Sequence, residues 1–217
     1  MRRKGMHMKK IIVIDDHPVI VLALKTCLEQ VGDLSVVDVS DSGQDGLEKV
    51  KRHVPDLVIL DLFLPKTDGL GMIRRIKAVS DKIRILVLTG HEEGLYAAKA
   101  AEEGANGFVT KSKDMTEIAN TVRALLAGYN CFPAAHLIAA QGINPQALKA
   151  SDALTALTVR ELAIMRYIAK GFSNKEIAAM FFISQKTVST YKARVLTKLK
   201  LKNSIAIAEY AREMGVV

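Results

Sequence analysis

The residues best suited to chemistry are polar side chains that directly follow short apolar runs. The run Leu57–Leu60 ends at Asp61, and a later run ends at Thr89. An earlier run ends at the pair Asp15 and Asp16. Carboxylates held side by side repel one another, so a divalent cation is their natural partner, and oxygen-only ligands with bound water favour Mg²⁺. Each acid could instead cap a helix or lie in a loop, and the surrounding elements decide between these alternatives.

The apolar runs recur at regular intervals and alternate with stretches in which apolar residues have helical spacing. Runs this short and this rich in β-branched residues predict buried strands. They are Lys10–Ile14, Ser35–Val39, Leu57–Leu60, Ile83–Leu88 and Gly107–Val109. Strands that alternate with helices predict βαβ units with right-handed crossovers, and therefore an α/β domain with a mostly parallel sheet.

In an open parallel sheet the chemistry lies at the carboxyl ends of the strands. If the first, third, fourth and fifth strands are neighbours, their ends bring acids, a hydroxyl and an amine to one edge. These residues are Asp15, Asp16, Asp61, Thr89 and Lys111. Each has a separate structural explanation, but their joint occurrence at successive strand ends favours a single site.

The same motifs resemble the receiver domain of bacterial two-component response regulators. They are the paired acids, Asp61 followed by Pro65 and Asp68–Gly69, Thr89–Gly90, and the run Gly107–Lys111. The resemblance covers residues 8–127 and implies a doubly wound, five-stranded parallel sheet of the flavodoxin-like type. It also implies that Asp61 accepts a phosphoryl group from a sensor histidine kinase.

This resemblance further implies a metal site. Asp16, Asp61 and the backbone carbonyl of Phe63 would hold Mg²⁺, and Asp15 would contribute through water. The cation and Lys111 would neutralise charge on the transferring phosphoryl group.

A switch is implied as well. The Thr89 hydroxyl and the Gly90 amide can bond the phosphoryl oxygens only after transfer, so Thr89 can draw in its loop while Phe108 turns inward to fill the vacated space. Two residues depart from the family pattern. Ser112 stands where proline usually follows the active-site lysine, and Leu64 replaces a common methionine with little change of volume.

The net charge of +8 is concentrated in the last third of the chain. Residues 151–217 carry 11 Lys+Arg against 5 Asp+Glu, whereas residues 1–127 carry 19 against 18. This distribution predicts a polyanion partner for the last third, although a solvated basic face would have the same composition. We expect a linker at 128–152, with a short helix around Ala134–Ala140, and a last domain at 153–217.

Repeated helix-start signals predict four helices in the last domain. Thr158 and Ser173 each stand three residues before a glutamate, which is the pattern of a capping box. Ser184 is a third N-cap, and Asn203 or Ser204 is a fourth. The expected helices are 159–169, 174–181, 185–200 and 204–214, and the second and third have the spacing of a helix-turn-helix. Any small helical bundle could carry such caps.

The third of these helices has a core side with Val188, Tyr191 and Val195, and an opposite side with no evident packing role. Short side chains there, flanked by positive charge, suit a recognition helix in the major groove. We expect DNA contacts from Lys186, Thr187, Ser189, Thr190, Lys192, Ala193, Arg194 and Lys198. Ser189 and Thr190 would read base edges, while the basic residues and Thr187 would mainly hold phosphate.

The caps and this helix resemble the LuxR-type DNA-binding domain. The segments that carry the resemblance are Leu157–Glu161, Gly171–Ala178 and Ile183–Tyr191. With the receiver, the chain resembles a NarL/FixJ-family response regulator, which implies a transcription factor whose binding to double-stranded DNA is switched by phosphorylation. We expect a homodimer when active, formed through an apolar stripe from Ile205 to Ala211, unless that stripe packs on its own domain.

The composition indicates in which cellular compartment the protein is expected. No apolar run approaches the roughly 20 residues needed to cross a bilayer, and a predicted strand follows the basic start where a signal peptide would have its apolar core. Cys27 and Cys131 form no disulfide framework and no metal-ligand spacing, which fits a reducing cytoplasm. We therefore expect a cytoplasmic protein without a membrane partner.

Two other functions remain open at this point. A Mg²⁺-dependent phosphohydrolase also uses an aspartate nucleophile on an α/β sheet, but the Asp-x-Asp spacing known from haloacid-dehalogenase-like enzymes is missing after the first strand. A regulator that binds DNA without phosphorylation would keep the basic domain permanently on its site. The intact set of acids favours phosphorylation control, and the missing Asp-x-Asp spacing favours a protein that is not an enzyme.

Overall fold

The computed structural model describes residues 8–30, 32–65, 67–90, 94–133, 156–181, 183–214 and 216–217. The chain divides into two compact units, Met1–Gln141 and Gly142–Val217. The short helix expected around Ala134–Ala140 lies outside the described residues.

The first unit contains the expected five-stranded sheet. Its strands are β1 (Lys9–Ile14), β2 (Leu34–Ser40), β3 (Leu57–Leu60), β4 (Arg84–Thr89) and β5 (Gly107–Thr110). Their order is β2-β1-β3-β4-β5, and every neighbouring pair is parallel. All four side chains of β3 are fully buried, because the central strand is covered on both faces. The predicted fold class is confirmed.

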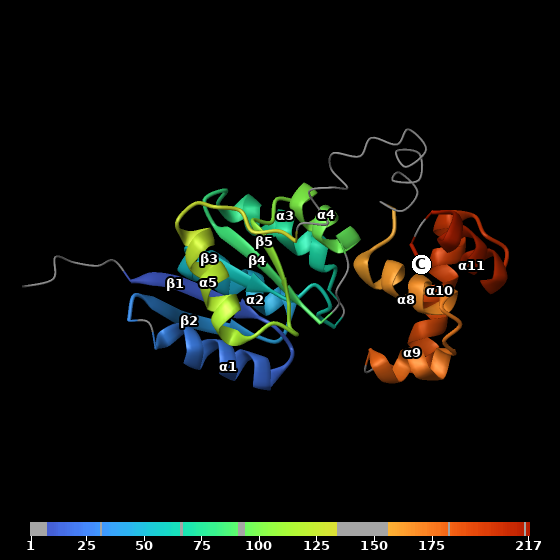
Figure 1. The fold of residues 1–217 in the computed structure, drawn as a ribbon, viewed down its shortest axis with the longest axis horizontal. Coiled ribbons are helices and arrows are strands. Elements are labelled where there is room, and N and C mark those ends of the chain that lie inside the picture. The colour runs from blue at the N-terminus through green and yellow to red at the C-terminus, as the bar shows by residue number, and fades with distance from the viewer. Residues whose placement is uncertain are drawn as a thin grey trace, which may run out of the picture. The chain divides into compact units, whose positions relative to one another are not determined.

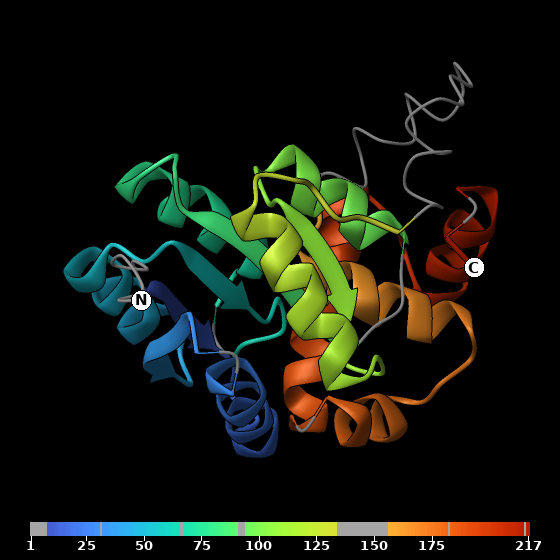
Figure 2. The ribbon, with the colours of Figure 1, turned by 60° about the vertical axis from the view of Figure 1, so that its left-hand side comes forward.

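In the described part of this unit, five helices cover the sheet: α1 (Pro18–Glu29), α2 (Gly43–His53), α3 (Gly69–Val79), α4 (Gly94–Glu102) and α5 (Met115–Leu126). Helices α1 and α5 lie on one face, and α2, α3 and α4 lie on the other (Figure 1). Alternate strand residues such as Ile11 and Ile59 pack with Leu24 of α1 and Val122 of α5 in one core cluster. Figure 2 shows α5 lying along β4 and β5.

Strand order and register bring the site residues to one edge. Ile14 pairs with Leu60, and Leu60 pairs with Val87, so β1, β3 and β4 end close together. Asp15 and Asp61 directly follow the first pair, and the Asp61 amide donates to the Ile14 carbonyl at 2.9 Å. The acids are therefore neighbours because their strands are.

The chain stays attached to the sheet after α5. Residue Cys131 forms an isolated parallel bridge with Gly107. The Phe108 amide donates to the Cys131 carbonyl at 2.8 Å, and the Cys131 amide donates to the Asn106 carbonyl at 2.9 Å. The first residues after α5 thus lie along the outer edge of β5.

The second unit is helical, with α8 (Val159–Ala169), α9 (Asn174–Met180), α10 (Gln185–Leu199) and α11 (Ser204–Glu213). The Thr158 and Ser173 side chains form complete capping boxes, and Ser184 caps α10. The fourth cap is Asn203, whose side chain accepts from the Ala206 amide at 2.9 Å. Among the described residues, no helix is both long and apolar enough to cross a membrane.

Candidate functional site

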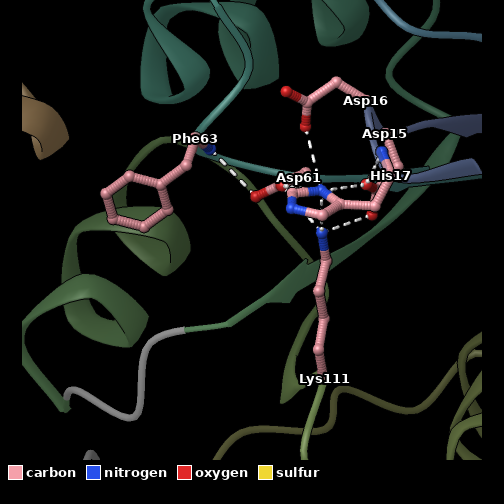
Figure 3. A network of polar contacts seen from close by, with 6 residues as sticks. All are labelled: Asp15, Asp16, His17, Asp61, Phe63 and Lys111. Atoms are coloured by element: carbon pink, nitrogen blue, oxygen red, sulfur yellow. Dashed lines mark hydrogen bonds and ion pairs between the residues drawn. The ribbon is translucent and has the colours of Figure 1, made fainter. Parts of the chain in front are cut away.

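Two buried carboxylates and one ammonium form the centre of the site (Figure 3). Asp15 and Asp61 are each 2% exposed. Lys111 follows β5, and its Nζ lies 2.7 Å from Asp15 Oδ2 and 2.8 Å from Asp61 Oδ2. The three side chains come from the ends of β1, β3 and β5, as the motif spacing predicts. Lys111 therefore offsets the negative charge that the strand order concentrates here.

The Asp61 carboxylate is held by the backbone that follows it. Its Oδ1 accepts from the Phe63 amide at 2.9 Å. The Phe63 ring points away from the acids and meets Tyr96 of α4 edge to face, with the ring centroids 5.7 Å apart. Tyr96 is fully buried, and sequence reasoning missed it because one tyrosine in a helix carries no motif.

Asp15 is the acid with the most unfavourable surroundings. Burial raises its pKa above the ordinary aspartate value, and the nearby charge of Asp61 raises it further. The hydrogen bond and charge of Lys111 act in the opposite direction. The net raised pKa shows that the folded receiver holds this charge at a cost, which a bound cation would reduce.

The donor set fits a divalent cation. One ligand atom from each of Asp15, Asp16, His17 and Asp61 lies within 4.8 Å of all the others. Asp15 Oδ2 and Asp16 Oδ1 are buried, and they face Lys111 at 2.7 Å and His17 at 3.0 Å. Buried carboxylates held this close together are stabilised by further positive charge. Sequence reasoning did not include His17, which directly follows the acid pair.

The predicted switch residues lie on or directly after β4 and β5. Thr89 is fully buried at the end of β4, and its carbonyl accepts from the Lys111 amide at 2.7 Å. Gly90 is exposed, and residues 91–93 lie outside the described part of the chain. The Phe108 ring is already inside, at 3% exposure. The side chain therefore has the inward position that the resemblance assigns to the switched state.

Ser112 is held by a side-chain contact. Its hydroxyl lies 2.8 Å from the Thr110 hydroxyl, and either group can donate. This contact spans Lys111, in the turn where the family usually has proline.

Helix α10 presents the surface expected to meet DNA. Val188 and Val195 are fully buried, whereas Lys186, Ser189, Thr190, Ala193 and Arg194 are exposed. Thr187 and Lys192 are half-buried. This pattern of burial matches the core side and the opposite, exposed side that the sequence predicts for this helix.

The two hydroxyl groups expected to read bases on this surface already donate hydrogen bonds to backbone carbonyls of α10. Thr190 donates to the Lys186 carbonyl and Ser189 donates to the Gln185 carbonyl, both at 3.0 Å. Ser189 also accepts from Asn174 Nδ2 of α9 at 3.1 Å. Thr190 therefore offers an outward methyl group and an acceptor oxygen, while Ser189 links α9 to α10.

One of the residues expected to contact phosphate also has partners within its own domain. The Lys198 Nζ lies 2.6 Å from Glu161 Oε2 and donates to the Ala156 carbonyl at 3.0 Å. An ammonium held by a buried carboxylate of its own domain has less charge left for phosphate, so we expect Lys198 mainly to position α10 against the start of α8. Charge counting alone predicts only its contact with phosphate.

Comparison with known proteins decides the family. The model of the response regulator receiver domain matches residues 11–123, and that of the luxR family of bacterial regulatory proteins matches residues 155–211. The chain belongs to the response-regulator family. This response regulator combines a receiver with a LuxR-type DNA-binding domain, as the motifs predict.

Similar proteins and a solved structure match this chain over more than nine tenths of its length. The response regulator is 38% identical to the virulence factors putative positive transcription regulator BvgA of Bordetella pertussis, covering 94% of this chain and 96% of BvgA. It is 37% identical to the Fimbriae Z protein of Salmonella typhimurium, covering 93% and 95%. A structure of two RcsB dimers bound to two parallel DNAs has a TM-score of 0.57 at 25% identity, covering 94% and 98%.

Proposed function

We propose that this response regulator is a transcription factor whose DNA binding is controlled by phosphorylation of Asp61. The observation that carries the proposal is the buried Asp61 carboxylate at the end of β3, with Lys111 Nζ 2.8 Å away. The proposed receiver comprises residues 8–127, followed by a linker at 128–152 and the DNA-binding domain at 153–217. A sensor histidine kinase would be the phosphoryl donor in the cytoplasm.

The transfer itself requires little from the protein beyond positioning and charge. An Asp61 oxygen attacks the phosphorus of a phosphohistidine, forming a P–O bond while the P–N bond breaks. The electron pair returns to the imidazole nitrogen, which takes up a proton from solvent. Lys111 moves its ion pair toward the new phosphoryl oxygens, and the Phe63 amide keeps the carboxylate oriented.

A divalent ion would supply charge neutralisation at the transferring group. Asp15, Asp16, Asp61 and the Phe63 carbonyl are the proposed holders of Mg²⁺, with Asp15 acting through water. The close grouping of the Asp15, Asp16 and Asp61 oxygens, two of them on buried residues, supports this assignment.

We propose that the effect of phosphorylation is transmitted by the switch residues Thr89, Gly90 and Phe108. The Thr89 hydroxyl and the Gly90 amide gain partners only when a phosphoryl group is present. Phosphorylation would therefore stabilise one arrangement of the loop after β4, with Phe108 inside, over another.

The proposed DNA surface is the exposed side of α10. Lys186, Thr187, Lys192 and Arg194 would hold phosphate, and Ser189, Thr190 and Ala193 would lie at base edges. Binding as a homodimer is supported by the RcsB relative, whose dimers were solved on DNA. On α11, Ile205 is exposed and available for such a contact, whereas Ala211 is buried in its own unit.

The test is the affinity for a specific DNA site before and after treatment with acetyl phosphate and Mg²⁺. Wild type should bind more tightly after treatment, and Asp61→Asn should not respond. Asp81→Asn, an exposed acid in the turn before β4, is the matched control and should respond like wild type. Equal affinity of treated and untreated wild type would contradict the proposal and indicate a regulator that binds DNA independently of phosphorylation.

A phosphohydrolase is not favoured, because both matched families are regulatory and the relatives are transcription regulators. We propose that the chain is not an enzyme. Steady turnover of a phosphate ester, lost in Asp61→Asn, would contradict this.

A further inference from the structure

The Tyr96 side chain is fully buried, and it lies against the segment that follows the phosphoacceptor strand β3. Its ring meets the Phe63 ring edge to face, with an interplanar angle of 82° and the centroids 5.7 Å apart. Phe63 is itself only 8% exposed. This buried contact joins α4 to the residue that stands two positions after Asp61.

The backbone of Phe63 orients the Asp61 carboxylate. Its amide donates to Asp61 Oδ1 at 2.9 Å, which closes a short turn of the chain. A local bond between an aspartate and the backbone two residues later forms in many loop conformations, so it does not fix the loop by itself. Side chains that point out of the site must hold it, and the Phe63 ring points away from the acids (Figure 3).

The residues on both sides of Phe63 are anchored in the core. Leu62 and Leu64 are fully buried, and a Cβ at Gly69 would lie 2.6 Å from the Leu62 Cα, so α3 begins directly against this segment. The ring contact with Tyr96 adds the restraint on Phe63 itself, because an edge-to-face pair has a preferred geometry that resists rotation of either ring.

We propose that Tyr96 is a positioning residue for phosphoryl transfer to Asp61 and acts through the Phe63 ring. The inference rests on the proposed function and adds to it a residue outside the acidic edge. An attacking carboxylate must be held in its reactive orientation, and a displacement of about 1 Å can lower a rate by about two orders of magnitude. Without the ring contact, the Phe63 amide can swing away from Asp61 Oδ1, so fewer molecules hold the carboxylate ready.

The test compares Tyr96→Leu with Tyr96→Phe in the full-length protein. Tyr96→Leu removes the aromatic ring, whereas Tyr96→Phe keeps it. Phosphate uptake from acetyl phosphate with Mg²⁺ should be about tenfold slower in Tyr96→Leu and within about twofold of wild type in Tyr96→Phe. Hydrogen exchange of the Phe63 amide, followed by nuclear magnetic resonance without cation or phosphate, should be about tenfold faster in Tyr96→Leu only.

Leu28→Ala is the matched control for a loss of core packing. Leu28 is fully buried in α1, within the core cluster that α1 and α5 form on the sheet. This variant should lower the midpoint of thermal unfolding but keep the wild-type uptake rate and the wild-type exchange of the Phe63 amide, at a temperature where every variant is folded. Equal slowing of uptake in Leu28→Ala overturns the inference. So does an unchanged rate in Tyr96→Leu, or a Tyr96→Phe variant as slow as Tyr96→Leu.

A double-mutant cycle tests whether the effect passes through Phe63. Phe63→Leu keeps the backbone amide but loses the ring, so it should slow uptake as Tyr96→Leu does. The double variant should be no more than about twofold slower than Phe63→Leu, because both changes remove the same contact. Losses that multiply in the double variant would show that Tyr96 acts by another route and overturn the inference.

Failure of the proposed function is a separate result. Wild-type protein that takes up no phosphate from acetyl phosphate refutes that function. Equal uptake by wild type and Tyr96→Leu refutes only the inference.

Discussion

The Glu161 carboxylate binds the Lys198 ammonium at 2.6 Å and also accepts from the Thr158 amide at 2.9 Å. Glu161 is 2% exposed, so one buried carboxylate completes the capping box of α8 and anchors the last turn of α10. The relationship gives Lys198 a positioning role for the proposed recognition helix.

Replacing Lys198 by methionine should therefore destabilise the DNA-binding unit without removing a phosphate contact. The loss leaves Glu161 buried with only its cap partners, at a cost of about 1–2 kcal/mol because the lysine is partly exposed. Thermal unfolding followed by circular dichroism measures this cost. The slope of log affinity against log salt should keep its wild-type value.

Lys192→Met is the comparison for this variant. A lysine that binds phosphate should lower the salt slope by about one unit when it is removed. The positioning role of Lys198 would be wrong if Lys198→Met reduced the slope as much as Lys192→Met and left the stability unchanged.

Gly69→Ala should destabilise the receiver by about 3 kcal/mol, since overpacking against fixed backbone cannot be relieved by a rotamer change. A Cβ at this position would clash with the Leu62 carbonyl oxygen and lie 2.6 Å from the Leu62 Cα. Denaturant unfolding measures the loss. Gly90→Ala is the control, because a Cβ there meets no atom within 4 Å, and an equal loss in both variants would disprove the steric explanation.

Asp15→Asn should stabilise the receiver when no divalent ion is present. A raised pKa means that the ionised carboxylate is less favourable in the folded state than in the unfolded state, so at neutral pH the neutral amide relieves a cost. The midpoint of thermal unfolding should rise by a few degrees. Added Mg²⁺ should then raise the midpoint of wild type more than that of the variant, and the opposite order would contradict the prediction.

Ser173→Ala should return the pKa of Glu176 toward its ordinary value. The Ser173 hydroxyl and amide, both bonded to the Glu176 carboxylate, lower that pKa in the folded protein. A lowered carboxyl pKa contributes stability that is present above the ordinary value of 4.5 and is lost as the pH falls through the folded value. Carboxyl titration by nuclear magnetic resonance measures the shift, and Ser184→Ala should leave it unchanged.

Much of the fold is encoded locally, which is why it could be predicted from the sequence. The starts of the last four helices follow from Thr158, Ser173, Ser184 and Asn203, whose side chains satisfy amides that the helix leaves free. The strands are short apolar runs between polar breaks, and their order is implied by the resemblance to the receiver domain and seen in the structure.

The features that escaped prediction depend on contacts between distant segments. The positive charge of Lys198 is visible in the sequence, but its pairing with Glu161, 37 positions earlier, is not. The edge-to-face packing of Tyr96 on Phe63 requires α4 to lie beside the loop after β3. His17 directly follows the acid pair, yet its place at the start of a helix does not reveal that its ring contacts Asp15 and Asp16.

The bridge between Cys131 and Gly107 has a consequence for the edge of the sheet. β5 is the last strand, and an uncovered edge strand is a template on which other chains can pair and aggregate. The two backbone hydrogen bonds of Cys131 cover that edge. Its carbonyl oxygen lies 3.1 Å from where a Cβ at position 107 would stand, so Gly107 leaves no room for a larger side chain. A receiver shortened to residue 127 would expose this edge, whereas one that extends through Pro133 keeps it covered.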